Sequence, residues 1–105
     1  MNAGAGKVLK RVESLLRLPP EYPYEELRKV LEFLGFRERK AKGSHRVFVG
    51  PHPLPPHSKI RLVVPLKQGR WVKRVYLQQV IKTLDLEAWY GRQKSQKEGR
   101  KRKPG

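Results

Sequence analysis

The chain has 105 residues, enough for one modest hydrophobic core, and its 25 Lys and Arg against 9 Asp and Glu give a formal net charge of +16. Such a charge is typical of proteins that bind a polyanion, so RNA, DNA and an anionic membrane surface are the partners to consider. The absence of cysteine excludes disulfides and thiolate chemistry, and no apolar run approaches the roughly 20 residues that span a bilayer, so we expect a cytoplasmic protein.

Two amphipathic helices are expected in the first third of the chain. Apolar residues recur at helical spacing over residues 7–18, and Pro19-Pro20 ends that pattern because proline cannot donate to the helix ladder. A second apolar stripe predicts a helix over 24–34, with Pro23 in its first turn.

Short strand-like runs follow the second helix. Residues 37–42 are polar and are predicted to form a solvated edge strand, and 46–49 are predicted to pair back through a turn at Gly43. Residues 60–64 form the clearest strand pattern in the chain. Four prolines within 50–58 exclude regular pairing and predict an exposed loop between the last two strands.

A helical stripe returns over residues 72–84, and the apolar residues just beyond it are expected to fold over the end of that helix. Residues 91–105 hold seven cations, one anion and no aliphatic or aromatic side chain. This composition predicts a disordered basic tail that raises affinity for RNA without selecting a sequence. A solubilising end without a partner is the alternative.

The expected order of elements is therefore helix, helix, three strands, helix. It predicts an α+β fold: a dsRBD-like α-β-β-β-α core, whose three-stranded antiparallel sheet is covered by two helices, with an additional N-terminal helix. The corresponding division of the chain is an N-terminal helix and linker over 1–21, the dsRBD-like domain over 22–90 and the basic tail over 91–105.

The sequence Lys42-Gly43-Ser44-His45, at the turn between two predicted strands, has the residue types of a phosphate site beside an imidazole. Gly43 lets the chain reverse tightly, Ser44 offers a hydroxyl, and the imidazole of His45 can give or take a proton near neutral pH. In a basic chain this combination indicates a metal-free ribonuclease. An ordinary hairpin glycine followed by a surface histidine is the alternative.

Several segments together resemble the HicA toxins. The resemblance covers roughly residues 24–86, and its sharpest element is Gly43-Ser44-His45, placed eight residues after Gly35-Phe36 and before a strand. The other matching segments are Glu26-Leu27, Leu34-Gly35-Phe36, Val64-Pro65 and a closing helix through Leu77 and Ile81.

The resemblance implies a dsRBD-like fold and the activity of an mRNA interferase, the toxin half of a pair with a HicB antitoxin. In that family the histidine of this motif is catalytic, which assigns catalysis to His45. The helix at 7–18 looks like the extension of longer family members. The chain departs from the family pattern at Lys67, where members often have histidine, at Val75-Tyr76, where they often have Gly-Thr, and in its longer loop over 51–58.

Cleavage of RNA through its own 2′-hydroxyl requires a base, an acid and stabilisation of the phosphate charge. His45 can serve as base or acid, which leaves the opposite step to Lys42, Lys67 or water. The cations Lys67, Arg70, Lys73 and Arg74 lie near the start of the last helix, where backbone N–H groups also attract phosphate. With Lys42, Gly43 and Ser44 they make up the predicted RNA-binding set.

No metal or other cofactor is expected. His52 and His57 lie in the proline-rich loop without the third and fourth ligands that a metal site needs. The expected partners are mRNA and a HicB-like antitoxin, with no membrane, and the protein is expected as a monomer or in the antitoxin complex. Two functions are considered: an endoribonuclease toxin, or a non-catalytic RNA-binding module, such as one associated with the ribosome, in which His45 only contacts RNA.

Overall fold

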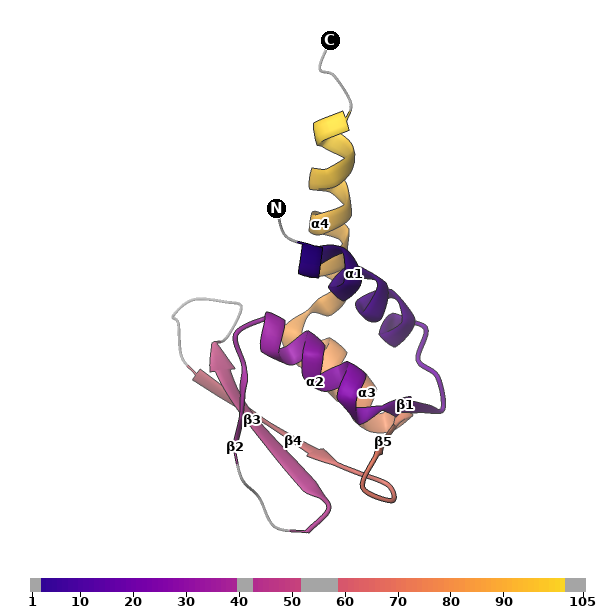
Figure 1. Cartoon of the computed structure of the whole chain (residues 1–105), viewed down its shortest axis with the longest axis vertical. Coiled ribbons are helices and arrows are strands. Elements are labelled where there is room, and N and C mark those ends of the chain that lie inside the picture. Colours follow the sequence, from indigo (N-terminus) through magenta and orange to yellow (C-terminus); the bar gives the residue numbers. More distant parts are fainter. Residues whose placement is uncertain (1–2, 40–42, 52–58, 102–105) are drawn as a thin grey trace.

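The computed structural model describes residues 3–39, 43–51 and 59–101 of the chain. Its elements follow the expected order, with one small sheet and a C-terminal helix added (Figure 1). They are α1 (Ala3–Leu16), β1 (Glu21–Pro23), α2 (Tyr24–Phe33), β2 (Arg37–Arg39), β3 (His45–Pro51), β4 (Lys59–Pro65), β5 (Trp71–Lys73), α3 (Arg74–Leu84) and α4 (Leu86–Lys101). The prediction of an α+β fold with a dsRBD-like α-β-β-β-α core and an extra N-terminal helix is confirmed.

The main sheet has the order β2-β3-β4, and both pairs of strands are antiparallel. Its register places Phe48 opposite Leu62 and Glu38, and both apolar side chains enter the core. Gly50 lies so close to the ring of Phe36 that a Cβ there would come within 2.5 Å of it. The glycine therefore lets the chain after α2 approach β3 closely.

The second sheet pairs β1 with β5 and was not predicted. Its register sets Tyr22 opposite Val72, and both side chains are buried. We expected the last helix to begin at Val72, but the structure extends Trp71–Lys73 as a strand and begins α3 at Arg74. Pro23, expected inside the first turn of α2, is instead the last residue of β1 and precedes that helix. Each strand of the small sheet thus leads directly into a helix.

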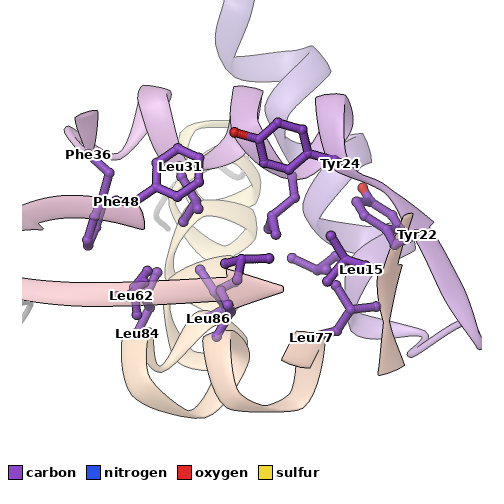
Figure 2. Close-up of a cluster of buried hydrophobic side chains, with 14 of the residues drawn as sticks. Leu15, Tyr22, Tyr24, Leu31, Phe36, Phe48, Leu62, Leu77, Leu84 and Leu86 are labelled. Carbon is purple, nitrogen blue, oxygen red and sulfur yellow. The ribbon is translucent and has the colours of Figure 1, made fainter. Parts of the chain in front are cut away.

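One hydrophobic core joins the sheet to α2 and α3 and is completed by Leu15 of α1 and Leu86 of α4 (Figure 2). A second cluster of Val8, Val12 and Val30 packs α1 against α2, with Trp89 of α4 against it. The N-terminal helix is therefore an integral part of the packed domain.

Helix α4 continues through Lys101 and projects beyond α1 at the end of the molecule where the chain terminates (Figure 1). Residues 91–101 are thus helical where we expected irregular chain, and 102–105 lie outside the described residues. No proline interrupts this segment, and its Lys, Arg, Gln and Glu residues have high helix propensity. In the described part of the chain, no helix has the length and apolar character needed to cross a membrane.

Candidate active site

His45 begins β3 directly after an exposed turn, and its own side chain is exposed. Its partner across the sheet is Pro65, the last residue of β4. The carbonyl oxygen of the preceding Ser44 accepts the N–H of Leu66 at 2.7 Å. Pairing with the end of β4 therefore holds the backbone of the Ser44–His45 segment while the imidazole stays open to solvent.

Gly43 has a φ of +63°, in the left-handed region that favours glycine. An added Cβ would meet no atom within 4 Å, so the requirement for glycine comes from the backbone and not from space. The predicted turn glycine is confirmed, whereas Lys42 lies outside the described residues.

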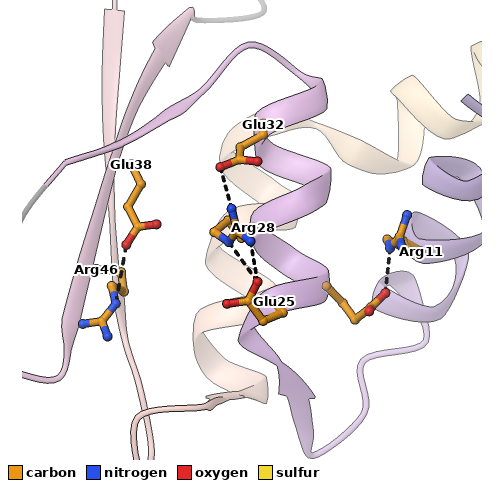
Figure 3. Close-up of polar contacts among 7 residues, drawn as sticks. Arg11, Glu25, Arg28, Glu32, Glu38 and Arg46 are labelled. Carbon is orange, nitrogen blue, oxygen red and sulfur yellow. Dashed lines mark hydrogen bonds and ion pairs between the residues drawn. The ribbon is translucent and has the colours of Figure 1, made fainter. Parts of the chain in front are cut away.

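Arg46 holds this turn from the side of the sheet that faces the helices. Its Nη1 donates to the carbonyl oxygens of Gly43 and His45, each at 3.2 Å. The same guanidinium lies 3.5 Å from the carboxylate of Glu38 (Figure 3). It also lies over the ring of Tyr24, 5.7 Å from the ring centroid. The sequence does not indicate this role, because nothing in a strand pattern shows that an arginine side chain folds back onto the adjacent turn.

A hollow of about 160 Å³ lies beside Pro65, the cross-strand partner of His45. It is lined by Pro65, Leu66, Lys67, Lys73 and Tyr76. The fold thus brings Lys67, from the segment after β4, and Lys73, from β5, to the end of β4 next to the turn. Tyr76 is half-buried at the edge of the core, and Trp71 is half-buried opposite Pro23.

Lys67 has an unpredicted partner. Its Nζ donates to a carboxylate oxygen of Glu21 at 2.5 Å, across 46 residues of sequence. The contact depends on β1 and on the bridge between Lys67 and Trp71, neither of which the sequence indicated. The ammonium of Lys67 is therefore already paired with a carboxylate, while both side chains remain partly exposed to solvent.

The other predicted cations have different positions. Arg74 donates from Nε to the carbonyl oxygen of Leu18 at 2.8 Å, and its backbone N–H donates to Pro20 at 3.0 Å. The first N–H of α3 is thus already bonded and is not free for phosphate. Arg70 and Lys73 are exposed, and Lys73 directly precedes α3. His52 and His57 lie outside the described residues.

Taken together, the site offers an exposed imidazole on a glycine turn, with a small cationic hollow next to its partner strand. Such a group can exchange a proton with a bound RNA, and nearby ammonium groups can balance the phosphate charge. Among the described residues, no three His, Asp or Glu side chains gather closely enough to hold a metal ion.

A family model described as the HicA toxin of bacterial toxin–antitoxin systems matches residues 24–86. The match runs from the first residue of α2 to the first residue of α4 and includes the Gly43 turn, His45 and Lys67. It covers more than half of the chain. Neither the comparison with curated proteins nor that with solved structures finds a match.

Proposed function

The chain belongs to the HicA toxin family, whose members are the toxin half of toxin–antitoxin pairs, and we propose that it is an mRNA interferase. In this proposal it cleaves mRNA without a metal ion, with His45 as the general acid or base, and a HicB-like antitoxin neutralises it. The observation that carries the proposal is the place of His45: an exposed imidazole, on a turn that needs glycine, within the segment that matches the family.

The proposed reaction uses the RNA's own nucleophile. A base removes the proton of a 2′-hydroxyl, the 2′-oxygen bonds to the adjacent phosphorus, and the bond from phosphorus to the 5′-oxygen breaks. An acid gives that leaving oxygen a proton, so the products are a 2′,3′-cyclic phosphate and a 5′-hydroxyl. Imidazole suits either step, since it exchanges protons near neutral pH.

The proton transfer that His45 does not perform requires a second group, which can be Lys67, Lys42 or water. The ammonium of Lys67 is already paired with the carboxylate of Glu21, and we assign Lys67 to balancing phosphate charge and not to proton transfer. Because the site is open, a solvent water can take the second proton-transfer step. We therefore assign that step to water and expect slow turnover.

RNA binding in the proposal uses the turn and the hollow beside it. In this proposal Lys42, the backbone of Gly43 and the hydroxyl of Ser44 bind RNA at the turn. Lys67 and Lys73, which line the hollow at the end of β4, bind it there together with the exposed Arg70. Arg74 is assigned a smaller part, since its guanidinium is bonded to Leu18. These contacts place the backbone and do not select bases.

The alternative is a non-catalytic RNA-binding module. Two features favour this alternative: His45 is the only histidine at the turn, and Lys67 is already paired with Glu21. The two functions differ in one measurable property, because only an interferase destroys messages in the cell.

Expression of the chain from a tight inducible promoter in a bacterial host tests the proposal. Wild-type protein should arrest growth and shorten mRNA seen on northern blots, and co-expression of a short reading frame adjacent to its gene should relieve the arrest. His45→Ala should be harmless at equal protein level, while His57→Ala, which removes an imidazole outside the matched motif, should remain toxic. Arrest by His45→Ala, or intact mRNA during arrest by the wild type, would refute the interferase.

A further inference from the structure

The three strands of the main sheet have two faces of very different character. Phe48, Leu62 and Val64 point to the helices and lie in the core. Arg46 lies on the same side, since its guanidinium covers Tyr24 of α2. Because side chains alternate along a strand, the neighbouring positions must lie on the opposite face. Val47, which is buried yet belongs to neither core cluster, agrees with this assignment.

The face away from the helices is basic. The strand positions on it carry the cations Arg37, Arg39, Lys59 and Arg61, all of them exposed. The only acidic residue on the three strands is Glu38, and it points the other way, toward Arg46. Among the described residues, no carboxylate forms an ion pair with any of these four cations.

His45 lies on this same face. The register forms rows across the strands: Arg37, Val49 and Arg61 make one row, and Arg39, Val47 and Val63 make the next. His45 and Pro65 form the row after that. Two residues of strand span about 7 Å, so Arg39 is about 7 Å and Arg61 about 13 Å along the sheet from the imidazole row.

We infer that this open sheet face, defined by Arg37, Arg39, Lys59 and Arg61, binds the backbone of single-stranded RNA and leads it to His45. The inference rests on the proposed function, since it names the surface that presents the substrate to the imidazole. Arg39 contacts the phosphate next to the cleaved one, and the row of Arg37 and Arg61 contacts a phosphate further along the strand.

Single-stranded RNA fits this face better than a duplex does. Val63 is 47 % exposed between the cations and the His45 row, and an apolar side chain there can contact only bases that are unstacked and splayed from a helix. A 2′-hydroxyl must also rotate into line with the bond it breaks, which a regular helix does not allow. At the far end lies a hollow of about 590 Å³, which Arg37, Arg39 and Lys59 line together with Glu38 and Pro51. It gives a nucleotide room beside three cationic residues and one acidic residue.

The test measures binding separately from cleavage. A fluorescently labelled oligonucleotide of 2′-O-methyl RNA, which cannot undergo attack by its 2′-oxygen, is titrated with the full chain, and anisotropy is followed at several salt concentrations. The sheet-face variant is Arg37→Gln/Arg39→Gln/Arg61→Gln. The matched control, Lys10→Gln/Lys29→Gln/Lys82→Gln, removes the same charge from exposed positions on α1, α2 and α3.

The sheet-face variant should bind at least about 10-fold more weakly, and its slope of log K against log salt should fall by about two, because three phosphate contacts are lost. The affinity of the control variant should fall less than about threefold, because it loses the same net charge but no phosphate contact. Arg37→Lys/Arg39→Lys/Arg61→Lys should keep most of the affinity, which separates lost charge from a damaged sheet. An unlabelled duplex of the same sequence should compete poorly.

Equal losses in the two triple variants, or effective competition by the duplex, would overturn the inference. Unchanged affinity of the sheet-face variant for RNA would also overturn the inference, and would point to an acidic protein as the partner of this face. The outcome is independent of catalysis: a protein that binds through this face yet cleaves nothing refutes the interferase alone. A protein that cleaves RNA while the sheet-face variant binds normally refutes the inference alone.

Discussion

The carbonyl oxygen of Ser44 accepts the backbone N–H of Leu66 at 2.7 Å, one residue before Lys67. This bond extends the pairing of β3 and β4 past their last partners, His45 and Pro65. It ties the turn that carries the imidazole to the segment that carries the ammonium. The relative placement of His45 and Lys67 is therefore set by backbone hydrogen bonds and does not depend on the side chains themselves.

Replacement of the turn glycine tests how far activity depends on this geometry. Gly43→Ala forces a side chain into a left-handed conformation, which costs about 1–2 kcal/mol. If the turn relaxes to avoid that cost, the His45 backbone moves, and RNA cleavage should fall at least about 10-fold while the melting temperature drops by a few degrees.

The matched control is Gly69→Ala. Gly69 also has a positive φ, of 70°, and a Cβ added there would meet no atom within 4 Å. It should lose similar stability and keep most of the cleavage rate. Equal rates for Gly43→Ala and wild type would show that the imidazole does not need this turn.

Removal of the carboxylate that pairs with Lys67 should strengthen RNA binding. Glu21→Gln leaves the Lys67 ammonium free for phosphate, so the Kd for single-stranded RNA should fall severalfold and the salt slope should rise by about 0.7. Because the pair is partly exposed, thermal stability should change by no more than about 1 kcal/mol. Glu13→Gln, an exposed carboxylate on α1, is the charge control. Identical affinities for the two variants would place Lys67 outside the RNA path.

Two buried tyrosines should respond oppositely to loss of their hydroxyls. The Tyr22 hydroxyl donates to the carbonyl oxygen of Arg11 at 2.9 Å and lies 3.1 Å from Ser14 Oγ. Tyr22→Phe should therefore lower the free energy of unfolding by about 1–2 kcal/mol. The buried Tyr24 hydroxyl has no hydrogen-bond partner among the described residues, so Tyr24→Phe should be neutral or stabilising at neutral pH. Chemical denaturation of both variants provides the measurement.

The same two tyrosines should make the folded state less stable at alkaline pH. Burial raises the pKa of both hydroxyls, and near Tyr24 the Glu38 carboxylate raises it further. The unfolded chain then releases these protons from about pH 10 while the folded protein retains them, so stability should fall as pH rises above about 10. The decline should be shallower in Tyr24→Phe. An identical alkaline profile for the wild type and Tyr24→Phe would contradict this origin.

Loss of the basic end should weaken RNA binding without changing where RNA is cut. Residues 91–105 carry seven cations and one anion, a net of +6, and no aromatic residue that could stack on a base. If about half of these cations engage phosphate, truncation after Tyr90 should lower the salt slope by roughly two. Primer extension on one message should show the same cleavage sites. A shifted pattern would mean that the end of α4 takes part in recognition.

The parts of the fold that the sequence predicts best are those with a strong local pattern. Helix α2 and strands β3 and β4 can be predicted from their apolar patterns, because each buries one side against the same core. Strands β1 and β5 cannot be predicted in this way, since each has only three residues and pairs with a strand about 50 residues away in the sequence. Composition alone was also a poor guide to residues 91–101, where Lys, Arg, Gln and Glu of high helix propensity continue α4.

The candidate site divides in the same way. His45 and Gly43 are recognisable because their chemistry depends on residue type and on the neighbouring turn. The partner of Lys67 and the role of Arg46 are not, since Glu21 reaches Lys67 through a sheet absent from the pattern and Arg46 folds back on backbone carbonyls. The cationic sheet face emerges only once the register aligns Arg37 with Arg61 across Val49.

The central claim, metal-free cleavage of RNA by His45, is tested most directly with purified protein and one long RNA in EDTA, followed by analysis of the fragment ends. The wild type should cleave, leaving 5′-hydroxyl ends opposite 2′,3′-cyclic phosphates or the 3′-phosphates formed from them. His45→Ala should be slower by about 100- to 10,000-fold, the usual contribution of one positioned proton-transfer group. Cleavage at the wild-type rate by His45→Ala, fragments with 5′-phosphate ends, or activity that appears only when magnesium or manganese replaces the EDTA would contradict it.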